Sequence, residues 1–346
     1  MAGLDFHLSR RLAAEERDEI QRFLDRVDDS TLEQDPEMPR ILRDPRRPCF
    51  FTARREGRIV CYAQILERPQ GPFARAELPF GPVFSDPEAL LPSLEAIHRS
   101  YSLAGFASLS IGLGVRDTAW TREIEAALER RIRIRRQDDD RNWSSLAVDL
   151  RREPRELLRR MSKGHRSAIK RALRDGLTVR RDLSPAAMET FSRLFLKMHA
   201  ARGHQVEAEQ TRAILHDTLA FLDRRKKGHL FLAADSGGAI LGGAIVVHQG
   251  TVARYYKGAA DPDRRNQPVL HPVLFEAMTT ARREGFRAFD LWGYNHRVGK
   301  EDQRYQINRF KKGFGGEFIS YPRIMYCFLG WRGAALRTLK KARGWL

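Results

Sequence analysis

The spacing of apolar side chains in the first third of the chain predicts a helix, a β-hairpin and a second helix. Apolar residues recur with helical spacing in residues 11–27, at Leu12, Ile20, Phe23, Leu24 and Val27. Residues 50–66 (FFTARREGRIVCYAQIL) are typical of two strands joined by a tight turn at Glu56-Gly57. A short strand near 76–78, a helix over 88–104 ending at Gly105 and a strand over 107–113 follow.

The same order of elements recurs about 180 residues later. Residues 229–248 predict strand, Ser-Gly-Gly turn and strand, and they are followed by a strand over 252–258, a helix over 268–284 and a strand over 286–292. Both hairpins begin F-x-A-x-x-x-G, at Phe51–Gly57 and Phe231–Gly237. A repeat of this length indicates a duplicated domain. Chance similarity between two hairpins is the alternative, and the helix and strand that follow in order favour duplication.

The repeat and the chain length together predict two domains. A chain of 346 residues exceeds one ordinary hydrophobic core. We expect a first domain over 1–148 and a second over 149–316, with the tail 317–346 packing back on the first. A hairpin, a strand, a helix and a strand in this order resemble the core of the GNAT acyltransferase fold. The expected fold class is therefore α/β, with two tandem GNAT-like domains of mixed sheets flanked by helices, although a fold alone does not give a function.

The net charge of +18 is confined to two segments of the chain. Residues 151–181 hold 12 Lys/Arg against 3 Asp/Glu, residues 297–346 hold the same numbers, and the remainder is balanced. Concentrated positive charge favours phosphates, nucleic acid or an anionic membrane surface. A basic surface without a partner is the alternative.

Composition argues against several other classes of protein. Cys49, Cys61 and Cys327 form neither a CxxC motif nor an even-numbered framework, which fits a reducing cytoplasm. The ten histidines show no HExxH or similar ligand spacing, so no metal is expected. Charges within the first ten residues argue against a signal peptide. The longest apolar stretch, about nine residues over 239–247, is too short to span a bilayer. We therefore expect a cytoplasmic protein.

The basic segment 154–175 is predicted to form one amphipathic helix. Its apolar side carries Leu157, Met161, His165, Ala168 and Ala172. Its other side carries Arg155, Arg159, Lys163, Arg166, Lys170 and Arg174. Because like charges four residues apart repel, we expect an anion to meet this side: tRNA phosphates, a diphosphate or a membrane. A solvated face is the alternative.

Three segments of the second half carry candidate chemistry. On the strand 254–260, Tyr255, Tyr256 and Lys257 alternate along the backbone, so some of them must face a cleft. Asp290 at the end of a strand can orient an amine or act as a general base; it can equally cap the loop or pair with an arginine. The run 309–316 (RFKKGFGG) places cations before glycines, which let a backbone approach a ligand closely. A lysine there can stabilise the anion that develops as an amine attacks a carbonyl.

In their order and spacing over roughly residues 140–320, these segments resemble the Fem family of peptidoglycan-bridge aminoacyltransferases. In the first half, Phe80 stands where the family has an arginine before Gly81-Pro82, which puts one substrate contact in doubt. No long helical insertion is visible, so the chain resembles the compact members. The resemblance is carried by Trp143-Ser144-Ser145-Leu146, Asp149-Leu150, residues 159–176, Arg202-Gly203, residues 255–259, residues 290–293 and the FKKGFGG run.

The resemblance implies an acyltransferase with no metal that moves an amino acid from aminoacyl-tRNA to an amine of a peptidoglycan precursor peptide, for cell-wall synthesis. It implies that Phe310 and Lys311 lie at the active site and that Tyr256 helps to hold the precursor's phosphates. The expected partners are tRNA and a UDP- or lipid-linked precursor. The expected catalytic residues are Lys311 and Asp290, and the expected substrate-binding residues are Phe310, Tyr255, Tyr256, Lys257, Arg202, Lys163 and Arg166.

Two other functions stay open. An acyl-CoA-dependent N-acyltransferase, acting on a cell-surface polysaccharide or another amine, would need a glycine-rich pyrophosphate loop before the long helix. Residues 264–269 read RRNQPV there, without glycine and with Pro268 lacking an N–H donor, which argues against CoA. A non-enzymatic nucleic-acid-binding module would use the cations of 155–174 and bind with strong salt dependence.

Residues 331–346 (WRGAALRTLKKARGWL) predict a small basic amphipathic helix. It could lie on an anionic bilayer at the inner face of the membrane, or it could dock on the first domain. Its apolar side carries Trp331, Ala335, Leu339, Ala342 and Leu346.

Overall fold

The computed structural model describes residues 3–28, 30–69, 71, 73–136, 144–264, 266–302 and 304–343. Trp143, Arg265 and Leu346, which carried part of the sequence argument, lie outside these residues. The chain forms two compact units, a first unit of Met1–Trp143 with Ser320–Leu346 and a second unit of Ser144–Ile319. None of the helices in the described residues combines the length and the apolarity needed to cross a bilayer.

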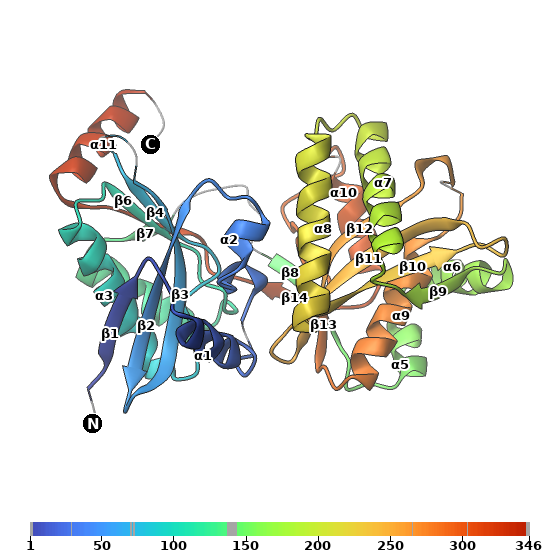
Figure 1. The fold of residues 1–346 in the computed structure, drawn as a ribbon, viewed down its shortest axis with the longest axis horizontal. Helices are drawn as coiled ribbons and strands as arrows, with labels where there is room; N and C mark the ends of the chain where they lie inside the picture. The colour runs from blue at the N-terminus through green and yellow to red at the C-terminus, as the bar shows by residue number, and fades with distance from the viewer. Residues whose placement is uncertain are drawn as a thin grey trace. The chain divides into compact units, whose positions relative to one another are not determined.

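The first unit is a mixed sheet with helices on both faces (Figure 1). Its strands lie in the order β1-β2-β3-β4-β6-β15-β7, and β5 pairs with β3. Its elements are β1 Asp5–Ser9, α1 Ala14–Leu24, η1 Leu32–Gln34, α2 Met38–Ile41, β2 Arg47–Arg55, β3 Arg58–Arg68, β4 Arg75–Leu78, β5 Val83–Phe84, η2 Pro87–Ala89, α3 Leu90–Leu103, β6 Ser108–Ile111, α4 Ala119–Ile132, β7 Arg135–Arg136, β15 Met325–Phe328 and α11 Gly330–Ala342.

The predicted hairpin of the first unit is confirmed as β2 and β3, joined by a two-residue turn. Glu56 and Gly57 both have positive φ (51° and 76°), which matches the right-handed twist of the two strands. Strand β2 alternates its side chains between two cores: Phe50 packs in the cluster with α1, and Phe51 packs in the cluster with α3. Both faces of this strand are therefore buried.

The second unit repeats this plan, with strands in the order β14-β8-β13-β12-β11-β10-β9. Helices α5, α6 and α9 pack on one face of the sheet, while α7 and α8 pack together on the other (Figure 1). Its elements are β8 Ser144–Asp149, α5 Pro154–Arg160, α6 Lys163–Arg174, β9 Thr178–Arg181, α7 Pro185–Ala201, α8 Ala208–Arg225, β10 Gly228–Ala234, β11 Ile240–Gln249, β12 Val252–Ala260, η3 Pro262–Arg264, α9 Leu270–Arg283, β13 Ala288–Asp290, α10 Arg304–Lys312 and β14 Glu317–Ser320.

The two seven-strand orders match position for position. At one position, however, the strand comes from a different part of the chain in each unit. In the first unit, β4 pairs parallel with β6, and β6 pairs antiparallel with β15 from the C-terminal segment. In the second unit, β12 pairs parallel with β13, and β13 pairs antiparallel with β8, which precedes the unit's own hairpin. The division expected at residue 148 therefore needs a correction, because residues 144–148 form a buried strand of the second sheet.

The single helix predicted over 154–175 is wrong: two helices occupy this segment. Helix α5 ends at Arg160, where Met161 turns to extended backbone, and Ser162 then caps α6 by accepting a hydrogen bond from the backbone N–H of His165. Serine is a favoured N-cap residue because its hydroxyl satisfies a backbone donor that the helix leaves unpaired. The predicted continuous row of cations is therefore divided between α5 and α6.

Strand β15 predicts a stability effect in the first unit from a residue near the C-terminus. Met325 in β15 and Met278 in α9 are both fully buried, in the cores of the first and second units. Met325→Ala should cost about 2–5 kcal/mol and raise amide hydrogen exchange in β2, β3, β4 and β6. Met278→Ala is the matched control and should act on β10 to β13. Faster amide hydrogen exchange in β10 to β13 of the Met325→Ala protein would contradict the assignment of β15 to the first sheet.

Candidate active site

Two parallel strands of the second unit separate at the point where the candidate residues lie. Strand β13 pairs with β12 only from Val252↔Ala288 to Arg254↔Asp290, whereas β12 continues to Ala260. A register shift against β11 leaves Tyr256 as the extra residue, between the pairs Val246↔Tyr255 and Ile245↔Lys257. Such a β-bulge kinks a strand and changes the direction of its side chains. The residues from Tyr255 onward therefore lie beyond the point where β12 pairs with β13, although they still lie beside β11.

A turn in left-handed backbone follows β13 and is held by Asp290. Trp292 and Gly293 have positive φ (46° and 55°), and for a tryptophan this is a strained conformation. The Asp290 carboxylate accepts hydrogen bonds from the Trp292 backbone N–H at 2.8 Å and from the Ser145 hydroxyl, and it lies 3.5 Å from Arg254 Nε. At 2% exposure, Asp290 is enclosed by these donors. Of the two roles expected for it, this geometry favours holding the turn.

Lys311 brings a positive charge to the same turn from helix α10. Its side chain is only 8% exposed, and its Nζ donates to the carbonyl oxygens of Trp292 and of Gly293, the latter at 3.0 Å. Nζ also lies 5.9 Å from the centre of the Tyr255 ring. Burial lowers the pKa of Lys311 to about 8, against the opposing effect of the Asp290 charge. The ammonium is therefore held in place by carbonyls and is close to losing its proton at neutral pH.

Further candidate residues lie on β12 and at the end of α7, and of these Tyr255 contacts Lys311. Burial raises the pKa of Tyr255 to about 12, while the positive charge of Arg202 acts in the opposite direction. Lys257 Nζ lies 5.1 Å from the Tyr256 ring centre and 5.5 Å from that of Phe195, and burial lowers its pKa. Arg202 itself is exposed at the C-terminal cap of α7.

Gly258 gives the Tyr255 side chain its place along the strand. A Cβ at position 258 would lie 2.0 Å from the Tyr255 hydroxyl, so only glycine lets the tyrosine lie along β12 at this point. The structure thus links Lys311 with Tyr255, Tyr255 with Arg202, and Lys257 with Tyr256; the sequence singled out all five residues.

Phe310 faces away from that charge, into an aromatic cluster with His165, His271 and Phe314. The ring centres of these residues lie 4.6 to 6.3 Å apart. His165 Nε2 lies 2.8 Å from the Phe310 carbonyl oxygen, which can only accept, so Nε2 carries the proton. Nδ1, 3.0 Å from the Ser162 hydroxyl, then accepts. Burial lowers the pKa of His165, which keeps it in this neutral form. His165 therefore fixes the end of α10, and Lys311 with it.

The glycines of the FKKGFGG run serve this packing. A Cβ on Gly313 would lie 2.0 Å from the His165 ring, and a Cβ on Gly315 would lie 2.5 Å from the Arg160 carbonyl oxygen. The cavity beside Phe314 and Gly315 measures about 10 Å³, which suits at most one water. The expectation that these glycines approach a ligand is corrected: Gly313 approaches α6, Gly315 approaches α5, and Gly316 approaches Ala147 of β8.

Lys163 and Arg166 are not brought to this group by any hydrogen bond or ion pair in the described residues. Lys163 is exposed at the start of α6. Arg166 Nη1 donates to the carbonyl oxygens of Arg159, at 3.2 Å, and Met161, and so joins α5 to α6. Arg166 therefore makes a structural contact, and its expected contact with substrate stays a prediction.

Sequence reasoning missed the residues that hold the site together. Arg254 was passed over beside the tyrosines, although an arginine on a central strand needs a buried carboxylate such as Asp290. His165 was assigned only to an apolar helix face. The serine at position 162 was a signal that a helix begins there and that the following residues should be considered separately.

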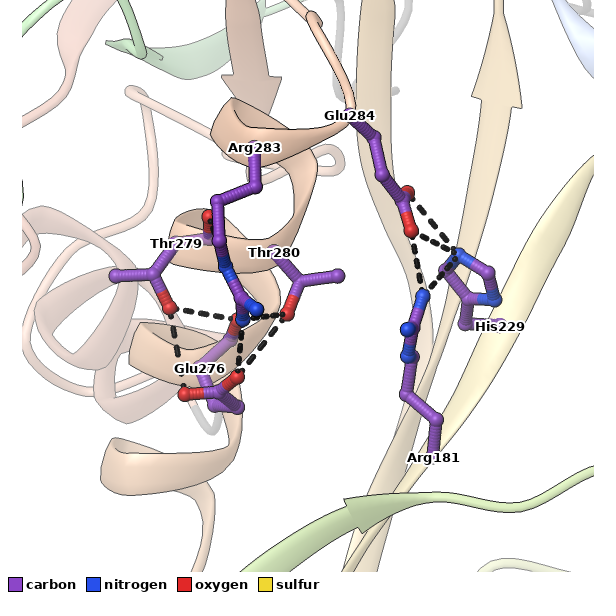
Figure 2. Close-up of polar contacts among 7 residues, drawn as sticks. All are labelled: Arg181, His229, Glu276, Thr279, Thr280, Arg283 and Glu284. Atoms are coloured by element: carbon purple, nitrogen blue, oxygen red, sulfur yellow. Dashed lines mark hydrogen bonds and ion pairs between the residues drawn. The ribbon is translucent and has the colours of Figure 1, made fainter.

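Three potential metal ligands come together elsewhere in the second unit. His229, His248 and Glu284 place one ligand atom each within 4.8 Å of one another, the one such group found in the described residues. Figure 2 shows the Arg181 guanidinium pointing into this group, where it donates to Glu284 and lies 3.2 Å from His229 Nε2. A guanidinium thus already neutralises the carboxylate that a cation would need.

Figure 2 also shows Glu276, Thr279, Thr280 and Arg283 hydrogen-bonded to one another along α9.

Comparison with known proteins finds a matching domain model and a relative that is similar over part of its length. Residues 159–306 match the model of the acetyltransferase (GNAT) domain. This range contains β12, α9 and β13, and it ends before Phe310 and Lys311. An 84-residue stretch is 30% identical to the lipid II:glycine glycyltransferase of Staphylococcus haemolyticus (strain JCSC1435), and it covers 24% of this chain and 20% of that protein. The match thus spans about a fifth of the length of the relative.

Solved structures share the whole fold. The crystal structure of FemX aligns with a TM-score of 0.80 over 97% of this chain and 99% of its own, at 16% identity. A tandem GNAT protein from the clavulanic acid biosynthesis pathway aligns with a TM-score of 0.54 over 95% and 99%, at 13% identity. These matches confirm the α/β fold of two tandem GNAT-like domains. Together with the match to the glycyltransferase, the likeness to FemX confirms the resemblance to the Fem family.

The packing of Gly313 against His165 predicts a large effect from one added methyl group. Gly313→Ala should push the His165 ring away, displace the end of α10 and cost about 1–3 kcal/mol in unfolding free energy. Gly164→Ala is the matched control: it lies in α6 with no atom within 4 Å of its Cβ, and alanine there should be neutral or gain up to about 1 kcal/mol. Equal effects in chemical denaturation would contradict the packing account.

The buried His248, which lies beside His229 and Glu284, predicts loss of stability in acid. Burial lowers the pKa of His248 from 6.5 to about 4. The unfolded chain therefore takes up a proton below about pH 6.5 that the folded chain refuses, and stability falls with pH through that window. From about pH 7 to pH 5 this residue should account for about 2 kcal/mol. Between pH 7 and pH 5 the His248→Phe protein should lose about 2 kcal/mol less unfolding free energy than the wild type. An equal loss in the two proteins would show that His248 is not the group responsible.

Proposed function

We propose that this chain, a tandem GNAT protein with the fold of FemX, is an N-acyltransferase that joins an amino acid to an amine of a peptidoglycan precursor peptide. The observation that carries the proposal is the nearly buried ammonium of Lys311, held beside Tyr255 where β12 extends past the end of β13. The match to a lipid II:glycine glycyltransferase supports this class of reaction. The proposed donor is aminoacyl-tRNA, and the proposed acceptor is a UDP- or lipid-linked precursor.

The reaction needs little covalent chemistry from the protein. The acceptor nitrogen attacks the ester carbonyl carbon, a C–N bond forms, and the C–O bond to the tRNA ribose breaks. Negative charge develops on the carbonyl oxygen, and Lys311 supplies a positive charge for it in a site with little water. The proton lost by the amine ends on the ribose oxygen. Because its pKa is near 8, Lys311 can relay this proton: it donates its own proton to the leaving oxygen and takes up the one that the amine loses.

Asp290 acts here as a positioning residue. Its carboxylate accepts from the Trp292 N–H and so sets the turn whose two carbonyls receive Lys311. Phe310 acts in the same way through the cluster with His165.

Tyr255, Tyr256, Lys257 and Arg202 form the proposed binding region for the precursor's phosphates. Phosphate oxygens favour cations and hydroxyl donors, and Arg202 is exposed while Lys257 is partly so. The exposed cations of α5 and α6 are proposed to contact tRNA phosphates. Four of them, Arg155, Arg159, Lys163 and Lys170, have no ion pair within the described residues.

An acyl-CoA donor is the second candidate, and the match to the acetyltransferase (GNAT) domain favours it. The segment before α9 is unfavourable for a pyrophosphate. Pro268 has no N–H, and the Asn266 carbonyl is bonded to Arg171 Nη2 at 2.8 Å. Arg265 lies outside the described residues. Binding of acetyl-CoA in calorimetry, with turnover, would favour this candidate over aminoacyl-tRNA.

The proposal is tested by incubating the protein with a mixture of charged tRNAs and a UDP-linked muropeptide, followed by mass spectrometry. We expect the muropeptide to gain the mass of one amino acid residue only when the tRNA is charged. Lys311→Met keeps the length of the side chain and removes the charge, and we expect it to lower kcat by about 10²–10³-fold.

Two controls separate chemistry from folding in this variant. The thermal midpoint of Lys311→Met shows whether the turn at 292–293 persists. Lys312→Met is the matched control, because Lys312 is exposed and makes neither of the two hydrogen bonds to the turn. This variant should keep its turnover. Near-normal turnover of a folded Lys311→Met protein would refute the role of Lys311, and absence of any amino acid transfer with all charged tRNAs would refute the donor.

A further inference from the structure

Two large apolar side chains of the first unit stand out for their exposure. Leu103 is 83% exposed at the end of α3, and Trp331 is 77% exposed at the start of α11. No other large apolar side chain in the described residues reaches these values. Exposing this much apolar area has a cost in water unless something covers it.

The chain brings these two side chains to one place. Arg332, next to Trp331, donates from Nη1 to the carbonyl oxygen of Gly105, two residues after Leu103, at 3.1 Å. The Leu329 N–H donates to the Ala107 carbonyl oxygen at 2.9 Å. The start of α11 is therefore fixed against the turn that follows α3, and Leu103 and Trp331 belong to one surface.

Helix α11 attaches to the unit through one side and leaves its apolar side in solvent. Gly333 and Leu336 are buried, and a Cβ on Gly333 would lie 2.6 Å from the Ala107 carbonyl oxygen. The apolar row predicted from the sequence, Trp331, Ala335, Leu339 and Ala342, is exposed at every position described. Docking on the first domain thus uses the opposite side of the helix from the expected one; Leu346 lies outside the described residues.

Cations flank this exposed row on both sides. At 100° per residue, Arg332 and Arg343 lie along one edge of the row, and Lys341 lies beyond the other edge, about 80° from Trp331. Arg337 lies further round the helix, away from the row. On α3, Arg99 is exposed one turn before Leu103. An apolar row bordered by cations on a helix is the pattern of segments that lie in the interface of an anionic bilayer.

We propose that the surface formed by Leu103 and α11 binds an anionic lipid bilayer, with Leu103, Trp331 and Leu339 inserted among the acyl chains and the flanking arginines and lysines at the phosphates. Charge decides between a bilayer and a second copy of this chain, because two such surfaces would bring the same cations together. Each cation near an anionic surface adds attraction that falls with salt.

This inference deepens the proposed function, since a lipid-linked acceptor is held at a bilayer surface, and its test requires no acyl transfer. The probe is a set of vesicles, one of neutral phosphatidylcholine and one with roughly a third phosphatidylglycerol, sedimented with the full-length protein. We expect binding to the anionic vesicles that weakens as salt rises.

Variants locate the contact. Leu103→Ser with Trp331→Ser should lower the partition coefficient onto anionic vesicles by about tenfold or more. Lys341→Gln with Arg343→Gln, one cation from each side of the row, should reduce the dependence on anionic lipid. Leu173→Ser is the matched control: Leu173 is 57% exposed, on α6 of the second unit, and its loss should leave binding unchanged. All these side chains are exposed, so the thermal midpoints should stay within a few degrees of one another.

Three outcomes would overturn the proposal. They are no sedimentation with either kind of vesicle, equal sedimentation of the Leu103/Trp331 variant and the wild type, and a change of oligomeric state in gel filtration that accompanies the apolar substitutions without any change in vesicle binding. Failure of amino acid transfer with intact vesicle binding would count against the proposed function and leave this surface standing.

Discussion

The account depends on one ammonium group held where water is scarce. Lys311 Nζ donates to two backbone carbonyls, those of Trp292 and Gly293, and burial lowers its pKa. A buried lysine is costly unless its donors are satisfied. The turn that supplies those carbonyls is itself strained, since Trp292 adopts a left-handed conformation. Strain of this kind persists only when the surroundings fix it, here through Asp290, with Arg254 beside it.

The remaining architecture can be understood as support for that turn. Strand β13 ends at Asp290, so the turn begins where the parallel pairing with β12 stops. Helix α10 is fixed from behind by His165, for which Gly313 leaves room. Strand β8 precedes the hairpin of the second unit in sequence and pairs with β13. It brings the Ser145 hydroxyl to the Asp290 carboxylate, to which it donates. A local turn therefore depends on segments about 150 residues apart in sequence.

The sequence predicted the duplicated hairpin, strand, helix and strand, because period-two alternation and glycine turns are local signals. It also predicted Lys311, Tyr255 and Asp290 as site residues. It did not predict the break at Met161–Ser162, since the apolar spacing runs on through both helices. It did not predict that β8 joins the second sheet and β15 the first, because no local signal shows which sheet a short apolar strand joins. The glycines of the FKKGFGG run were interpreted as ligand contacts, and only the three-dimensional packing shows that they face His165, Arg160 and Ala147.

The central claim is that the fold holds Lys311 in an environment that brings its ammonium close to deprotonation at neutral pH. The direct measurement is an NMR titration of the lysine side chains in the isotope-labelled full-length protein, with Lys311 assigned by its loss in Lys311→Met. The account predicts a pKa of about 8 for Lys311. A pKa near the ordinary lysine value of about 10.4 would contradict it, because the side chain would then lie in water and away from the turn.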